Sequence, residues 1–167
     1  MSRSLILMRH ARQSGVAARD HDRPLTNEGR AEAYRVGAKL LELGEVPSQV
    51  LSSTALRCRE TLEALAAGIG QPIETDFEPN LYNASAHELL AALASVDDDV
   101  ESLLLLAHNP GMSMLALQLG AARESDLEAL RAGFTPATIA VFTIEGRWST
   151  VSARTSRLER FEPPPSA

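Results

Sequence analysis

The sequence predicts an α/β fold in three layers, with a mostly parallel central sheet, helices on both faces and an antiparallel hairpin at the C-terminal end. Apolar runs typical of buried strands alternate along the chain with segments of helical periodicity. The run at 103–106 holds four consecutive leucines, as expected for a central strand covered on both faces. Near the end, the glycine-containing segment 145–147 separates two apolar runs and predicts the hairpin.

The first half of the chain is predicted to hold three strands and two helices. The apolar run from Ser4 to Arg9 is the first strand, and the polar segment 10–24 is a long loop. Thr26 suits the N-cap of a helix whose apolar spacing continues to Gly44. The remaining elements of this half are a strand at 49–52, a helix capped by Ser53 or Thr54 and ended by Gly68 and Gly70, and a strand at 73–77.

The second half continues the same alternation. The acidic run at 97–99 is interpreted as a solvated turn, and Pro110 opens a helix because proline favours the first helical position. Trp148 is expected to pack the terminal hairpin against the body of the fold. The predicted elements are helices at 86–94, 110–119 and 125–132 and strands at 102–107, 137–144 and 148–153.

Length and composition indicate a single globular domain spanning residues 1–167, with a loose tail at about 162–167. The chain is 44% hydrophobic and 23% charged, and its net charge of -6 argues against a general nucleic-acid binder. Cys58 is the only cysteine, which excludes an intramolecular disulfide and a cysteine cluster for zinc. We find no membrane span and no signal peptide, so we expect a cytoplasmic protein without a membrane partner.

Polar side chains that suit a phosphate follow three of the predicted strands. Arg9 and His10 end the first strand, Arg57 opens the helix after the second, and His108 and Asn109 follow the four-leucine strand. The carboxyl ends of parallel strands meet in one crevice, so these groups can converge there. An arginine can donate two parallel hydrogen bonds to a phosphate, and a neutral histidine beside it can attack the phosphorus.

These residues lie in motifs that resemble the histidine phosphatase superfamily, which has the phosphoglycerate-mutase-like fold. Segment 8–11, M-R-H-A, resembles the Arg-His-Gly signature of that superfamily, with alanine in place of glycine. Segment 53–61 has the pattern S-x-x-x-R-x-x-x-T of its second block, and segment 106–110, L-A-H-N-P, is similar to its distal histidine block. The short chain and segment 22–26, D-R-P-L-T, are similar to the SixA-type phosphohistidine phosphatases.

The resemblance implies roles for four residues and no metal or other cofactor. His10 would be the nucleophile that becomes phosphorylated, and Arg9, Arg57 and His108 would surround the phosphoryl oxygens. Two arginines would then supply the charge that a metal ion supplies in other phosphatases.

Three further residues are weaker candidates for contact with phosphate or substrate, namely Arg23, Ser14 and Asn109. Arg23 has a competing interpretation, a structural salt bridge with Asp22 on the long loop. His21 is interpreted as a loop residue and His87 as a residue of a helix surface, while packing is favoured over reactivity for Cys58.

A general acid is not evident in the sequence. Larger members of the superfamily take a carboxylic acid from the segment after the third strand, and this region holds Glu74, Asp76, Glu78 and Glu88 without a matching flanking pattern. The imidazole of a phosphohistidine leaves readily, so the lack of an obvious acid mildly favours an N–P substrate.

Three functions are therefore open. The first is a metal-independent phosphatase that works through a phosphohistidine intermediate on a signalling phosphoprotein, such as a histidine phosphotransfer domain. The second is a phosphatase of a small phosphomonoester, such as a sugar or nucleotide phosphate. The third is a non-catalytic adaptor that binds phosphate and does not turn it over.

Overall fold

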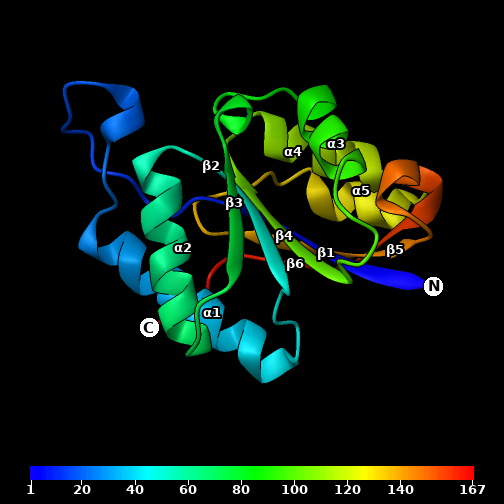
Figure 1. The fold of residues 1–167 in the computed structure, drawn as a ribbon, viewed down its shortest axis with the longest axis horizontal. Coiled ribbons are helices and arrows are strands. Elements are labelled where there is room, and N and C mark those ends of the chain that lie inside the picture. The colour runs from blue at the N-terminus through cyan, green and yellow to red at the C-terminus, as the bar shows by residue number, and fades with distance from the viewer.

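The computed structural model describes residues Met1–Ala167 and contains one six-stranded sheet between two layers of helices (Figure 1). The strand order is β3-β2-β4-β1-β5-β6, in which β1, β2, β3 and β4 run parallel while β5 and β6 are antiparallel additions. The predicted fold class is confirmed. The strands are β1 Ser2–Arg9, β2 Gln49–Ser53, β3 Glu74–Glu78, β4 Ser102–Ala107, β5 Ile139–Glu145 and β6 Ser156–Glu162.

Each face of the sheet carries its own hydrophobic core. Leu104 and Leu106 of β4 belong to the core under α1 and α2, whereas Leu103 and Leu105 belong to the core under α3, α4 and α5. Figure 1 shows these two groups of helices on opposite sides of the sheet. The four-leucine strand is therefore covered on both faces, as predicted. The helices are α1 Asn27–Leu43, α2 Leu56–Ile69, α3 Ala86–Ala94, α4 Gly111–Leu119 and α5 Glu124–Leu130.

Helix α2 differs from the prediction at both of its ends. Its N-cap is Ala55, whose methyl side chain cannot cap the helix. The Ser53 hydroxyl accepts the Ala55 backbone N–H and contacts His108 Nε2 instead of capping the first turn. The helix also continues through Gly68 and ends at Gly70, where φ is 92°. Gly68 serves the packing of α1 against α2, since a Cβ atom there would lie 2.1 Å from the Tyr34 carbonyl oxygen.

The prediction of a strand at 148–153 is wrong. The second strand of the terminal hairpin is β6, at 156–162. Two short 3-10 turns, η3 Trp148–Thr150 and η4 Ala153–Thr155, occupy the predicted position. The apolar residues there serve the core and not the sheet, since the Trp148 ring is fully buried and its Nε1 donates to the Val100 carbonyl at 2.8 Å. The other predicted elements are present with ends shifted by no more than one or two residues.

The acidic run at 97–99 does more than form a turn. The Asp98 carbonyl accepts a hydrogen bond from the Arg3 guanidinium at 2.7 Å, and the Asp98 carboxylate accepts one from the Trp148 backbone N–H at 3.2 Å.

At the end of the chain, Arg35 of α1 donates to the Pro165 carbonyl at 2.8 Å, which ties the tail to α1. None of the helices is both long and apolar enough to cross a bilayer.

Candidate active site

The residues singled out at three strand ends come together at one edge of the sheet. Arg9 is the last residue of β1 and His10 follows it, Arg57 lies in the first turn of α2, and His108 follows β4. The centroids of the His10 and His108 rings are 5.2 Å apart. Burial and the nearby positive charge of Arg57 lower the pKa of Arg9, so the two guanidiniums share one environment.

His10 is held as a neutral imidazole with one defined tautomer. Its Nδ1 lies 2.8 Å from the Ala11 carbonyl oxygen, which can only accept, so Nδ1 carries the hydrogen and Nε2 keeps its lone pair. Burial, with smaller effects from Arg57 and Arg9, lowers the pKa of His10 to about 4. At neutral pH the Nε2 atom is therefore available as a nucleophile.

His108 is also neutral, and its ring is supported from the second strand. The Ser53 hydroxyl lies 2.8 Å from His108 Nε2 and accepts the Ala55 backbone N–H at 3.2 Å, so its own hydrogen is free to be donated to Nε2. That arrangement leaves a hydrogen on Nδ1. Burial, followed by the charges of His10 and Arg57, lowers the pKa of His108 to about 3. Cys58 packs 3.8 Å from the ring, and burial raises the pKa of its thiol to about 12, so the thiol stays neutral.

Three buried nitrogen atoms of these residues have no hydrogen-bond partner. They are Arg9 Nε, Arg57 Nε and His108 Nδ1. Buried polar groups are normally paired, so each unpaired donor needs an explanation. An oxyanion bound among these side chains would supply acceptors for such donors.

Neighbouring residues hold the arginines and the strand end in place. The Phe134 carbonyl accepts from Arg9 Nη1 and from Asn109 Nδ2, both at 2.9 Å. The Asn109 oxygen accepts from Ser113, so the Asn109 amide is committed to positioning the loop and α4. Thr61 accepts the Ala11 backbone N–H at 3.0 Å and donates to the Arg57 carbonyl, which ties α2 to the end of β1.

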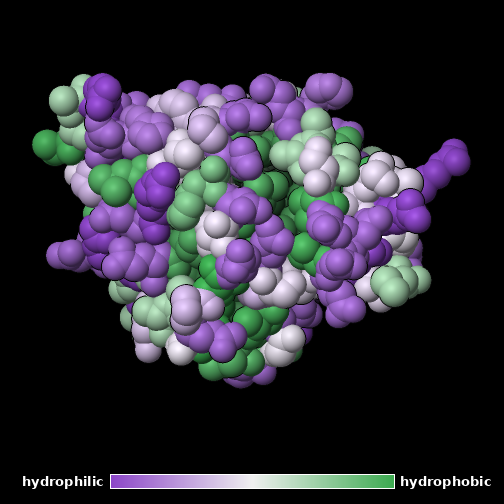
Figure 2. All heavy atoms as spheres, in the orientation of Figure 1, coloured by the Kyte–Doolittle hydropathy of each residue, from purple (hydrophilic) through white to green (hydrophobic).

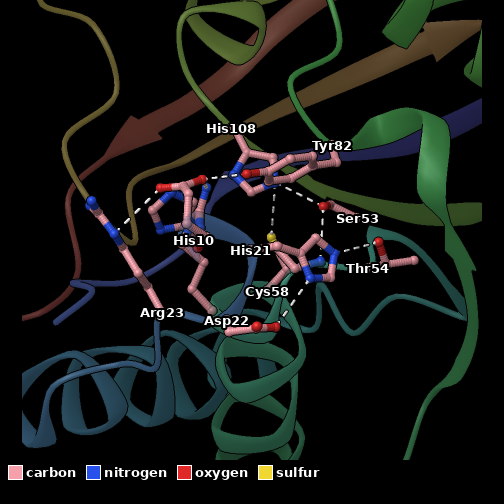
Figure 3. Close-up of polar contacts among 12 residues, drawn as sticks. His10, His21, Asp22, Arg23, Ser53, Thr54, Cys58, Tyr82 and His108 are labelled. Atoms are coloured by element: carbon pink, nitrogen blue, oxygen red, sulfur yellow. Dashed lines mark hydrogen bonds and ion pairs between the residues drawn. The ribbon is translucent and has the colours of Figure 1, made fainter. Parts of the chain in front are cut away.

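Asp20, which no sequence motif indicated, forms hydrogen bonds with two residues of this site. Arg57 donates to the Asp20 backbone carbonyl at 2.8 Å and to its carboxylate at 3.1 Å. The Tyr82 hydroxyl donates to the same carboxylate oxygen at 2.5 Å. The Tyr82 ring also meets the His108 ring edge to face at 5.4 Å (Figure 3). Asp20 and Tyr82 therefore close the crevice over Arg57 and His108.

The weaker candidates take different positions. Arg23 Nε lies 3.5 Å from the Asp20 carboxylate, which corrects the expected pair with Asp22, because Asp22 pairs with Arg19 at 3.0 Å. The Ser14 hydroxyl accepts the Val16 backbone N–H within the loop. His21, interpreted as a loop residue, does lie in the loop, but its ring also contacts Thr54 at 3.0 Å and the edge of the Tyr82 ring (Figure 3).

None of the four carboxylates that were considered as a general acid forms a hydrogen bond or ion pair with Arg9, His10, Arg57 or His108. Glu88 caps α3 through Ser85, and Asp76 and Glu78 line a separate hollow of about 650 Å³ between β3 and α3. The carboxylate that is present at the site is Asp20. Its pKa is lowered by the Tyr82 hydrogen bond and by Arg57, so it is ionised at neutral pH and has no proton to donate.

Comparisons with known proteins agree with this geometry. Residues 5–85 match the model of the histidine phosphatase superfamily (branch 1), a range that includes Arg9, His10 and Arg57. An uncharacterized protein of Mycobacterium tuberculosis is 34% identical over 163 residues, covering 94% of this chain and 99% of that protein. An uncharacterized chloroplastic protein of Arabidopsis thaliana is 36% identical over 133 residues, which cover 73% of this chain but only 61% of that protein.

A solved structure is similar along nearly the whole length of the chain. The SixA protein of Nakamurella multipartitia, which carries a provisional assignment as a phosphohistidine phosphatase, has a TM-score of 0.85 and 32% sequence identity. The alignment covers 99% of this chain and 98% of that one, so the similarity includes His108 as well as the N-terminal half.

Proposed function

Because the chain belongs to the histidine phosphatase superfamily, in its SixA-type branch, we propose that it removes phosphate from phosphohistidine on a signalling protein through a phospho-His10 intermediate. The chain is a phosphatase by family. Its substrate, its intermediate and the roles of its site residues are the parts that we propose here. A histidine phosphotransfer domain is the kind of partner that fits.

The observation that carries the proposal is the pairing of a nucleophile with unpaired donors. His10 offers a neutral Nε2, and the buried donors Arg9 Nε, Arg57 Nε and His108 Nδ1 lack acceptors. Phosphoryl transfer requires an attacking atom and positive groups around the equatorial oxygens, with little further covalent chemistry from the protein. The four residues at the strand ends supply both requirements.

The proposed reaction has two steps. In the first, His10 Nε2 forms a bond to phosphorus while the bond from phosphorus to the substrate nitrogen breaks, and the leaving imidazole takes the electron pair and a proton from water. In the second, a water molecule attacks phosphorus, the bond to His10 Nε2 breaks, and inorganic phosphate is released. Arg9 and Arg57 neutralise the oxygens in both steps, and Ser53 holds the His108 ring in place.

The choice of phosphohistidine as substrate follows from the acid–base groups at the site. Asp20 is ionised, and both His10 and His108 have strongly lowered pKa values, so none of them is a ready proton donor at neutral pH. A sugar alkoxide is a poor leaving group without such a donor, whereas an imidazole leaves readily. The likeness to a SixA protein supports the same choice.

A substrate panel tests the proposal. Phosphate release is measured from a histidine phosphotransfer domain phosphorylated by phosphoramidate, from a sugar phosphate and from a nucleoside monophosphate. We expect release from the phosphohistidine protein with kcat/KM at least tenfold above the esters, and none from any substrate with His10→Ala. Release from the esters with none from phosphohistidine would contradict the assigned substrate, and tight binding without release would indicate an adaptor.

A further inference from the structure

The arginine that the proposed reaction needs is already engaged by a carboxylate of the protein itself. Arg57 is bound by the backbone carbonyl and the carboxylate of Asp20, and Tyr82 holds the same carboxylate. We propose that Asp20 is an exchange residue, whose carboxylate binds Arg57 between turnovers, yields its place to the incoming phosphoryl group and returns as phosphate leaves. This inference rests on the proposed phosphate site and adds to it the control of anion entry and release.

The charges at the site favour exchange over simultaneous binding. Arg9 and Arg57 carry like charges in one environment, and the Asp20 carboxylate lies 3.1 Å from Arg57 and 3.5 Å from Arg23. A phosphoryl dianion on the two guanidiniums would balance their charge by itself. It would then stand beside the Asp20 carboxylate, and like charges at such a distance repel. The two anions therefore compete for Arg57.

The surroundings of Asp20 permit it to move while the rest of the site stays in place. The Asp20 side chain is 45% exposed, whereas the Arg57 side chain is 5% exposed. Asp20 lies in a 3-10 turn of three residues, Asp20–Asp22, which has no buried residue. Release of the carboxylate breaks bonds to Arg57 and Tyr82 without opening the core, and Arg23 remains within reach as an alternative partner.

Anion titration tests this exchange without any need for turnover. Tungstate and inorganic phosphate are titrated by calorimetry into the wild-type chain, Asp20→Asn and Tyr82→Phe. Asp22→Asn is the matched control, since Asp22 lies in the same turn and pairs with Arg19 instead of Arg57. We expect Asp20→Asn to bind both anions about threefold to tenfold more tightly, because a competitor of a half-exposed ion pair has been removed. Tyr82→Phe should tighten binding by a smaller factor, and Asp22→Asn should leave it within about twofold.

Two further measurements separate exchange from a merely structural role. The inhibition constant of phosphate during turnover should fall in Asp20→Asn by the same factor as its dissociation constant. In an Arg57→Ala background, Asp20→Asn should change anion affinity by a clearly smaller factor, because competition for Arg57 is lost and only the repulsion between the two anions remains.

The contrary results are distinct from a failure of the proposed function. Unchanged or weaker anion binding in Asp20→Asn, while the wild type binds normally, would overturn the exchange and show that Asp20 positions Arg57. Absence of anion binding in every variant, the wild type included, would instead remove the phosphate site and the inference together.

Discussion

Two hollows of the molecule differ in the sign of the charged side chains that line them. The crevice at the carboxyl ends of β1, β2 and β4 holds two arginines and two neutral histidines, and Asp20 and Tyr82 close it. The groove between β3 and α3 is about 650 Å³ and is lined by the carboxylates Asp76, Glu78, Glu88 and Asp97, with no lysine or arginine. Figure 2 shows, on the face where β3 lies nearest the viewer, apolar surface set among hydrophilic side chains.

The comparison shows that volume alone does not identify the site of chemistry. The groove has room but neither a positive group for a phosphate nor a nucleophile near one. The crevice contains buried donors without partners and a neutral imidazole with a free lone pair. Buried, unpaired polar groups are costly to keep, so three donors without partners beside one nucleophile indicate a place for a ligand.

Removing the nucleophile of the crevice is the strongest test of whether the crevice, and not the groove, carries the chemistry. His10→Ala deletes the atom that attacks phosphorus, so we expect turnover of a phosphohistidine protein to fall below detection. The measurement is phosphate release under single-turnover conditions. His87→Ala is the control, because His87 is an exposed imidazole on α3, and it should keep wild-type rates. Substantial turnover by His10→Ala would contradict the assignment.

Removal of one positive group should have the next largest effect. Arg57→Ala is expected to lower kcat/KM by about 100-fold to 1000-fold, the range typical of losing one donor that stabilises transition-state charge. Arg59→Ala is the matched control on the same helix, where Arg59 lies over the Phe77 ring and donates to the Thr54 carbonyl. Equal losses for the two arginines would argue against a specific role for Arg57.

The pH dependence provides a third comparison. A histidine with its ordinary pKa of 6.5 would be cationic and unreactive at pH 5, whereas His10, with a pKa of about 4, stays neutral there. We therefore expect kcat/KM, corrected for ionisation of the substrate, to remain level down to about pH 5 and to fall as pH approaches about 4. The Asp20 pKa is also lowered, so Asp20 remains ionised over the level range. An acid limb centred near pH 6.5 would show that burial does not keep His10 neutral.

The smallest effect is expected in the acidic groove. Neutralising two of its carboxylates with Asp76→Asn and Glu78→Gln should change kcat/KM for phosphoramidate by less than about twofold at physiological salt, because exposed charges are screened there. Steady-state assays at low and physiological ionic strength measure this. A loss comparable with that of Arg57→Ala would mean that the groove takes part in the chemistry.

The site residues that could be predicted are those whose position follows from the neighbouring sequence. Arg9 ends a buried strand, His10 and His108 directly follow one, and Arg57 lies in the first turn of the helix after one, so strand ends alone bring the four residues together. Asp20 and Tyr82 are 62 residues apart and lie in segments without periodicity, so no local pattern predicts their hydrogen bond. Two loops meet there only because the folded sheet positions them.

The prediction of the fold failed where burial did not come from a strand. Trp148 and Val151 are apolar and were interpreted as strand residues, but Trp148 opens a short 3-10 turn, Val151 directly follows that turn, and both are buried against the core. At 53–55, Ser53 or Thr54 was expected to cap α2, but the Ser53 hydroxyl supports the His108 ring and the Thr54 hydroxyl contacts His21. Hydrophobicity and capping preference indicate which structural roles a residue can take in its own segment. Its tertiary contacts decide which of these roles it takes in the folded protein.

The most direct test of the account is to trap the phosphorylated enzyme. The wild-type chain is mixed with phosphoramidate, quenched at alkaline pH within the first turnover and digested for mass spectrometry. We predict a phosphate of acid-labile type on His10 that appears and decays at rates matching turnover, and that is absent from His10→Ala. Steady turnover with no phosphate on His10 at any time, or a kinetically competent phosphate on another residue, would contradict the account.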